Sequence, residues 1–158
     1  MKKVGKIILS IIIVLALGFV SGAAAIKASD VYESLTLPVF APPAAAFRIV
    51  WPILYVILGI ILYRLRYYLP EKEDSERLRE ALNLFWVQLI INLLWTPVFF
   101  LLNAFWASFF WILLLIGTAG AAFLKMRRVD RVSFYLFIPY LLWIMYAAVL
   151  NFSIAVMN

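Results

Sequence analysis

Residues 81–101, ALNLFWVQLIINLLWTPVFFL, decide the class of fold, because this stretch is mostly apolar and contains no charged residue. It matches the ~20 residues that an α-helix needs to cross the hydrocarbon core of a bilayer. Lipid offers the backbone no hydrogen-bonding partner, so a crossing segment must satisfy its own amides, as a helix does. We therefore expect a transmembrane helix here.

Four further apolar stretches of similar length surround it, at about residues 6–26, 44–68, 104–124 and 133–156. Of the 158 residues, 67% are hydrophobic and 14% are charged, and the mean hydropathy is +1.04. Soluble domains are only about half apolar. The sequence therefore predicts an all-α integral membrane bundle of five transmembrane helices, in one domain covering residues 1–158. The link at Leu102-Asn103 is so short that its two helices should form a tight antiparallel hairpin.

The residue types that are missing exclude several kinds of chemistry. The chain contains no Cys and no His. Disulfides, thiolate and imidazole catalysis, and the usual zinc and haem ligands are therefore excluded. We expect no metal site and no required cofactor.

Most basic residues fall on one side of the predicted bundle. Twelve of the fourteen Lys and Arg residues share this side: Lys2, Lys3, Lys6, Arg64, Arg66, Lys72, Arg77, Arg79, Lys125, Arg127, Arg128 and Arg131. By the positive-inside rule, we expect a cytoplasmic N-terminus, with the C-terminus and the segment 27–46, called loop 1, outside. The net charge of +6 is therefore interpreted as a topology signal and not as a nucleic-acid surface. The charged stretch 71–80 is interpreted as a solvated connector that extends the next helix into water.

The first apolar stretch has two interpretations. A basic start, an apolar run and the small residues 21–25 also describe a cleavable signal peptide. A retained transmembrane helix is favoured, because the run is long for a signal core and Gly18 and Gly22 offer a helix-packing face.

Amides and aromatic residues share one face of the helix over 81–101. Gln88, Asn92, Trp95 and Phe99 follow spacings of four, three and four residues. An amide in lipid is costly unless it is hydrogen-bonded, so this face should point into the bundle. We expect Gln88, Asn92 and Trp95 to contribute to a binding site.

Two other predicted helices carry a similar pattern. One stripe of the helix over 133–156 combines Trp143, Ala147, Leu150 or Asn151, and Ile154, and the helix over 44–68 places Trp51 and Tyr55 one turn apart. Each of these three helices also contains a proline (Pro52, Pro97 and Pro139), which removes a backbone N–H. Kinked helices with aromatic walls leave room for a flat ligand, and we expect that cavity beneath loop 1.

Loop 1 is apolar and stiffened by Pro38, Pro42 and Pro43. We interpret it as a lid over the cavity, with Phe47 and Arg48 at its junction with the following helix.

A purely structural interpretation stands beside each of these assignments. Trp86, Trp106 and Trp111 fit an aromatic belt at the membrane surface. Trp51, Trp95 and Trp143 fit helix packing as well as ligand lining, and Gln88, Asn92 and Asn151 also fit hydrogen bonds between helices.

Three blocks of sequence resemble one family along the full chain. They read Leu37-Pro38-x-x-Ala41-Pro42-Pro43-x-x-x-Phe47-x-x-x-Trp51-x-x-Leu54-Tyr55, then Gln88-x-x-x-Asn92-x-x-Trp95-Thr96-Pro97-x-Phe99-Phe100, and finally Pro139-Tyr140-x-x-Trp143-x-x-x-Ala147-x-x-Leu150-Asn151. This pattern is similar to that of the TspO/MBR family, the tryptophan-rich sensory proteins and translocator proteins, also called peripheral-type benzodiazepine receptors.

The resemblance implies a five-helix bundle, often a homodimer, that binds porphyrins and other flat apolar ligands under the first loop. Carried over by position, the implied pocket residues are Trp51, Asn92, Trp95, Trp143, Ala147 and Leu150, with Pro42, Pro43 and Phe47 above them. One departure concerns sterols. Phe152 follows Leu150 without a later Lys or Arg, so the sterol-recognition pattern of animal members is incomplete and sterol binding is not expected.

Three functions are compatible with these residues. The first is a membrane receptor or sensor for porphyrins, with metal-free protoporphyrin preferred because haem iron would lack its commonest axial ligands. The second, implied by the resemblance, is light- and oxygen-dependent porphyrin degradation that uses Trp51 and Trp143, since no acid/base pair lies in the membrane. The third is transport of a small apolar solute. The sequence argues against it, because it lacks the internal repeat and the paired intramembrane charges that secondary transporters usually have.

Small residues offer surfaces for a homodimer. They are Gly117, Gly120, Ala121 and Ala122 in one predicted helix and Gly18 and Gly22 in another. The same residues can instead pack neighbouring helices within one subunit.

Overall fold

The computed structural model describes residues 3–23, 28–70 and 76–158, and these contain helices and no strands. The elements in order are α1 (Lys3–Ala23), α2 (Ala28–Ser34), α3 (Ala44–Tyr63), a π-helical turn η1 (Arg64–Tyr68), α4 (Glu76–Phe100), α5 (Phe105–Val129) and α6 (Arg131–Met157). Five of them, with η1 continuing α3, are long and apolar enough to cross a membrane. The predicted five-helix membrane bundle is confirmed.

The predicted helix boundaries are close to the observed ones, with instructive differences. Part of the first predicted helix and the stretch 71–75 lie outside the described residues. The charged segment does extend α4, which begins at Glu76. Loop 1 differs from expectation, because it contains the short helix α2.

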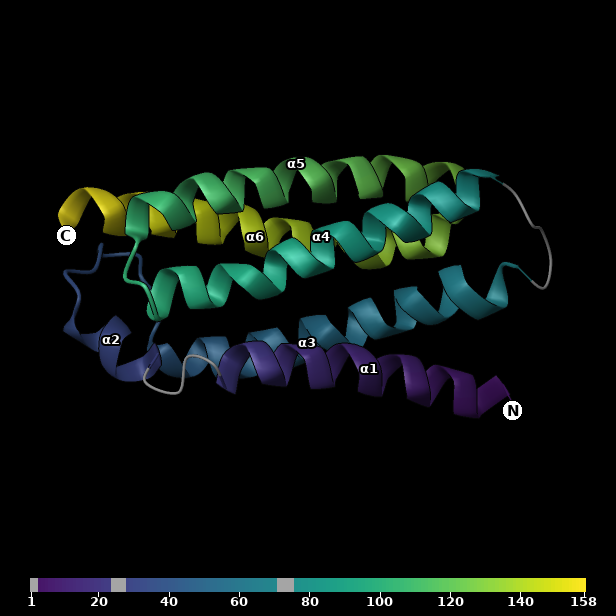
Figure 1. Ribbon diagram of the computed structural model, residues 1–158, viewed down its shortest axis with the longest axis horizontal. Coiled ribbons are helices and arrows are strands. Elements are labelled where there is room, and N and C mark those ends of the chain that lie inside the picture. Colours follow the sequence, from purple (N-terminus) through teal and green to yellow (C-terminus); the bar gives the residue numbers. More distant parts are fainter. Residues whose placement is uncertain (1–2, 24–27, 71–75) are drawn as a thin grey trace.

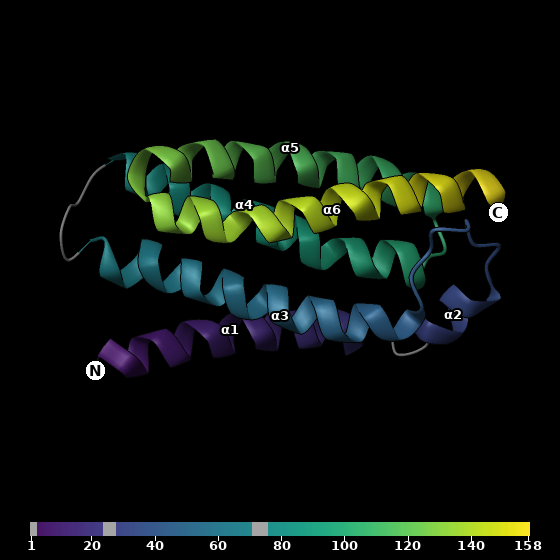
Figure 2. The ribbon, with the colours of Figure 1, turned by 180° about the vertical axis from the view of Figure 1, so that it is seen from behind.

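The long helices form two layers. One layer contains α1 and α3, and the other contains α4, α5 and α6, as Figures 1 and 2 show from opposite sides. The most extensive contacts are those within the layers, between α4 and α5, α1 and α3, and α5 and α6. The two termini lie at opposite ends of the bundle, as five crossings require (Figure 1).

The α4–α5 connection is the tight antiparallel hairpin that the sequence predicts. Asn103 adopts a positive φ of 51° there. Asparagine tolerates this left-handed conformation better than most residues, because its short side chain can hydrogen-bond locally.

Close approach of α1 and α3 depends on two glycines. A Cβ at Gly59 would lie 2.6 Å from the backbone Cα of Ile11, and a Cβ at Gly18 would lie 2.2 Å from the ring of Tyr55. Of the two predicted roles for Gly18, packing within the subunit is therefore the one that the structure shows. Gly22, Gly117 and Gly120 face open space.

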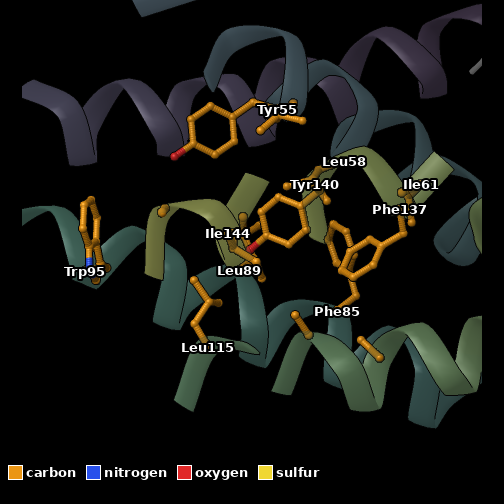
Figure 3. Close-up of a cluster of buried hydrophobic side chains, with 14 of the residues drawn as sticks. Tyr55, Leu58, Ile61, Phe85, Leu89, Trp95, Leu115, Phe137, Tyr140 and Ile144 are labelled. Atoms are coloured by element: carbon orange, nitrogen blue, oxygen red, sulfur yellow. The ribbon is translucent and has the colours of Figure 1, made fainter. Parts of the chain in front are cut away.

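A packed core fills the middle of the bundle. Figure 3 shows Phe85, Phe137 and Tyr140 gathered there, and all three are fully buried. The hydroxyl of Tyr140 on α6 donates a 2.6 Å hydrogen bond to Oε1 of Gln88 on α4. Burial of both polar groups is therefore compensated by the bond between them.

At the end of the bundle that carries the N-terminus, an ion pair joins the two layers. Arg64 contacts the carboxylate of Asp130 through Nε at 2.6 Å and through Nη2 at 2.8 Å. Asp130 also caps α6 by accepting from the backbone N–H of Ser133. We call this the basic end.

A candidate ligand-binding cavity beneath loop 1

A cavity of about 790 Å³ lies between the two layers, at the loop 1 end of the bundle. Every element except η1 and α5 contributes to its wall. The lining residues are Leu15, Gly18, Phe19, Gly22, Ala23, Ala28, Ser29, Tyr32, Ala44, Phe47, Arg48, Trp51, Pro52, Tyr55, Trp95, Thr96, Phe99, Phe100, Ala147, Leu150, Asn151 and Ile154. Its volume falls within the 300–1,000 Å³ typical of small-molecule sites.

Trp51 and Tyr55 form one aromatic wall on α3. Their rings stack with centroids 5.5 Å apart and planes 27° apart. Residues four positions apart lie on the same face of a helix, so the stack follows from the sequence spacing. The wall presents aromatic surface to the cavity.

Trp143 lies behind this wall and does not line the cavity, which corrects its predicted position. Its ring contacts Trp51 edge-on with centroids 6.4 Å apart and Phe47 with centroids 5.8 Å apart. It instead borders a shallow groove between α3 and α6. Its indole Nε1 is buried without a hydrogen-bond partner in the described part of the protein.

Trp95 and Asn151 close the other side of the cavity. Nε1 of Trp95 donates to Oδ1 of Asn151 at 3.1 Å, and Nδ2 of Asn151 donates to the carbonyl oxygen of Phe105 at 3.0 Å. The two side chains therefore combine both interpretations, since they bond helix to helix and also line the cavity. Ala147 and Leu150 line the same side, as predicted.

The prediction that Gln88 lines the cavity is wrong. Gln88 lies in the packed core, where it is fully buried, bonded to Tyr140 and donating to the carbonyl oxygen of Phe85 at 3.0 Å. Its predicted alternative role, a hydrogen bond between helices, is the correct one.

Asn92 lies below the cavity wall and not in it. It is 2% exposed, its side chain faces the Tyr55 hydroxyl, and its Nδ2 has no hydrogen-bond partner among the described residues. A buried donor without a partner costs about 1 to 3 kcal/mol. Asn92 therefore presents an unused donor next to a residue that lines the cavity.

Tyr32 of α2, in loop 1, and Phe47, in the first turn of α3, cover the cavity. The two rings meet edge-on at 5.2 Å. The Tyr32 hydroxyl donates to the carbonyl oxygen of Pro42 at 2.9 Å, and burial, with a smaller effect of Tyr146, raises the pKa of Tyr32 to about 12. The carbonyl of Pro42 thus ties the Tyr32 side chain to the later part of loop 1. Neither Pro42 nor Pro43, which immediately precedes α3, lines the cavity.

Two further contacts fasten loop 1 to α6. Asn158 bonds the backbone of Thr36 twice, with its Oδ1 2.9 Å from the amide nitrogen and its Nδ2 3.1 Å from the carbonyl oxygen. The hydroxyl of Tyr146 donates to the carbonyl oxygen of Phe40 at 3.0 Å. The predicted lid is thus held to the α4–α6 layer.

Sequence reasoning missed the contribution of α1 and α2 to the wall. Gly18, Gly22 and Ala23 offer little side chain to recognise, and Phe19 looks like a lipid-facing residue, with 77% of its surface exposed. Tyr32 was hidden in a segment interpreted as an irregular loop. Its signal was an aromatic residue within a short run free of Pro and Gly.

The remaining tryptophans differ among themselves. Trp106 is 49% exposed and packs beside Phe109 and Phe152, as a lipid-facing residue would. Trp111 departs from the expected belt role, because its Nε1 donates to the carbonyl oxygen of Ile91 on α4 at 2.8 Å.

Comparisons with known proteins place this chain among relatives of one family. Residues 10–157 match the model of the TspO/MBR family. The chain is 32% identical over 158 residues to the tryptophan-rich protein TspO of Chlorobaculum tepidum, covering 99% of this chain and 98% of that protein. It is 34% identical over 129 residues to Protein CrtK of Rhodobacter capsulatus, covering 80% and 78%. It is also 34% identical over 124 residues to the translocator protein of Ovis aries, covering 77% and 70%.

Proposed function

Because this chain belongs to the TspO/MBR family, we propose that it is a membrane receptor or sensor that binds porphyrins and similar flat apolar ligands in the cavity beneath loop 1. A relative from Cereibacter sphaeroides, 29% identical over 135 residues, is named a tryptophan-rich sensory protein, and that name supports a sensory role. The observation that carries it is the cavity itself, with aromatic rings on opposite sides.

The aromatic walls account for the preference for a flat ligand. Trp51 and Tyr55 on one side and Trp95 and Phe99 on the other give a planar ring system surfaces on which to pack. Each aromatic contact contributes about 0.5 to 1.5 kcal/mol beyond area burial. Together with burial of the macrocycle, such contacts are sufficient for micromolar affinity, which is about −8 kcal/mol.

Two polar groups suit the edge of such a ligand. Arg48 is exposed at the rim, where its guanidinium can pair with a carboxylate. Asn92 lies next to Tyr55, and its Nδ2 has no partner among the described residues. A small shift of the Tyr55 ring would give an acceptor atom of the ligand access to this donor. A porphyrin that carries carboxylate groups offers acceptors for both.

Quenching of tryptophan fluorescence by protoporphyrin tests the proposal. Saturable quenching with micromolar affinity is expected for the native chain, and Trp51→Ala should weaken binding at least tenfold. Trp106→Ala is the matched control, because Trp106 lies on the lipid-facing surface outside the cavity. Equal affinity in all three proteins would overturn the proposal.

A second candidate function, light-driven porphyrin degradation, is favoured by the contact between Trp51 and Trp143. In this scheme the excited porphyrin takes one electron from Trp51, and Trp143 refills Trp51. Molecular oxygen then adds to a carbon of the reduced ring, and the oxygenated porphyrin returns one electron to the oxidised Trp143. The net change is the addition of one O2 to the porphyrin, and both tryptophans are restored. Trp143 would act from behind the wall without touching the ligand.

Illumination of the purified protein with protoporphyrin in air distinguishes the two functions. A new absorbing product that is lost in Trp143→Phe, with binding affinity retained, would support degradation. Bleaching of protoporphyrin at the same rate as in empty detergent micelles would exclude degradation and leave binding as the supported function.

Transport of an apolar solute has less support. The cavity ends above the packed core around Phe85, Phe137 and Tyr140, and these residues are fully buried. Flux into liposomes above that of empty liposomes would nevertheless establish transport.

For orientation, we propose that the basic end is cytoplasmic and that loop 1 lies outside. Val39 at the surface of loop 1 is fully exposed, and the native chain has no Cys. A membrane-impermeant maleimide should therefore label Val39→Cys in intact cells. Labelling only after lysis would reverse the orientation.

We also propose a homodimer through the open face of α5 around Gly117 and Gly120. Gly117→Cys should form a disulfide-linked dimer in oxidised membranes. A crosslink that forms only between cysteines on other faces would contradict this interface.

A further inference from the structure

Three arginines surround the turn between α5 and α6. Arg127 and Arg128 lie in the last turn of α5, and Arg131 is the first residue of α6. All three are exposed. Within the described residues none of them forms an ion pair, whereas Arg64 and Lys125 each do.

The acid within this turn is turned inward and fully engaged. Oδ2 of Asp130 accepts from Nε of Arg64 at 2.6 Å, from Oγ of Ser133 at 2.6 Å and from the amide of Ser133 at 3.0 Å, while Oδ1 accepts from Nη2 of Arg64 at 2.8 Å. Its side chain is 8% exposed. Asp130 is therefore not available to neutralise the three arginines beside it.

The described acids on α4 do not neutralise the positive charge of the turn either. Glu80 is paired with Lys125, and Glu76 is one exposed carboxylate against three guanidinium groups. The turn thus presents a compact concentration of positive charge at the end of the bundle.

The surface beside the turn is apolar. Leu124 is 60% exposed on α5, and Val132 and Tyr135 are 48% and 63% exposed on α6. Exposed apolar residues next to arginines at the end of a transmembrane helix fit the boundary between acyl chains and headgroups, where tyrosine is also favoured. The guanidinium fork matches the geometry of phosphate oxygens.

We propose that the α5–α6 turn is a binding site for the phosphate headgroups of anionic phospholipids. Arg127, Arg128 and Arg131 contact the headgroup, and the exposed side chains of Leu124 and Val132 contact the upper part of its acyl chains. Phosphatidylglycerol is the probe, because it carries a net negative charge that phosphatidylcholine lacks. The inference is independent of the porphyrin proposal, since the turn and the cavity lie at opposite ends of the bundle.

Native mass spectrometry of the full chain in detergent tests this site. The chain is titrated with phosphatidylglycerol and, separately, with phosphatidylcholine of the same acyl chains. The native chain should retain phosphatidylglycerol preferentially, and the double variant Arg127→Gln/Arg128→Gln should lose roughly 10-fold or more of that preference. Inorganic phosphate at the same concentration should not displace the lipid.

The matched control is Arg66→Gln/Arg77→Gln, which removes the same charge from exposed arginines elsewhere at the basic end. It should keep most of the preference. Equal loss in both double variants would show a response to bulk charge and overturn the site, as would no loss in Arg127→Gln/Arg128→Gln or displacement by free phosphate. Thermal unfolding identifies the folded variants, and the single variant Arg128→Gln replaces the double one if that fails to fold.

Discussion

Ser21 on α1 donates a 2.6 Å hydrogen bond to the carbonyl oxygen of Leu93 on α4. In a regular helix that carbonyl would accept from the amide four residues later, but this position is Pro97, which has no N–H. A hydroxyl from the opposite layer thus satisfies the acceptor that proline leaves open. The proline and the serine act as one joint between the layers.

Removing this joint should destabilise the protein. Ser21→Ala leaves the Leu93 carbonyl without its partner, which is expected to cost about 1 to 2 kcal/mol of unfolding free energy. Thermal unfolding in detergent measures the loss. Ser153→Ala is the control, because the Ser153 hydroxyl only bonds the carbonyl oxygen of Val149 in its own helix. A melting temperature that falls equally in both variants would contradict the assigned role.

Acid should weaken the basic end at a defined pH. Burial alone would raise the pKa of Asp130, but hydrogen bonds from Arg64 and Ser133 lower that pKa from 3.8 to about 2. A depressed pKa means that the stabilisation is complete above the unfolded value and is lost as the pH falls from about 4 to about 2. Asp130→Asn should be less stable at neutral pH and should lose less further stability over that interval.

Unfolding measured from pH 6 to pH 2 checks this dependence. Glu80→Gln serves as the comparison, since the Glu80–Lys125 pair is exposed and pairs of that kind contribute little. An unchanged pH profile in Asp130→Asn would exclude Asp130 as the source.

A single methyl group should separate α1 from α3. Gly59→Ala places a Cβ 2.6 Å from the backbone of Ile11, which cannot move as a side chain does. We expect a loss of about 1 to 3 kcal/mol from overpacking. Gly22→Ala introduces its methyl group into open space and should be close to neutral in the same unfolding assay.

The lid should open faster when one of its bonds is removed. Tyr146→Phe deletes the donor to the Phe40 carbonyl while leaving a ring for the 6.5 Å contact with Phe40. Loss of about 1 kcal/mol should accelerate release of protoporphyrin roughly 5-fold if the bond is absent during escape. Stopped-flow fluorescence measures this rate, with the exposed Tyr135→Phe as control. Identical release rates would mean that ligand escapes without moving loop 1.

Helix number and pairing were predictable because lipid permits so few alternatives. The length of each apolar stretch and the short link at Asn103 were enough to give five spans and one hairpin. The cavity was predictable from Trp51, Tyr55 and Trp95, which lie on inward faces. Trp143 shares a helical face with Ala147, yet only the position of α3 determines that the Trp51 ring lies in front of it.

The contribution of α1 was not predictable in the same way. Gly18 matters because its missing side chain leaves room for Tyr55, and a sequence does not reveal which neighbour uses such a space. Gln88 and Asn92 lie one turn apart on one face, and their different fates depend on partners from other helices. Gln88 bonds Tyr140, whereas Nδ2 of Asn92 has no acceptor among the residues that the structure describes.

The bidentate pairing of Arg64 with Asp130 gives the two layers unequal freedom at their two ends. A thick ligand would push the layers apart at the loop 1 end, where neutral hydrogen bonds join them, and the Arg64–Asp130 ion pair would act as the pivot. Ligand binding in the cavity would thus change the shape of the bundle at its loop 1 end and not at its basic end. Any protein that responds to the bound state would have to approach from that side.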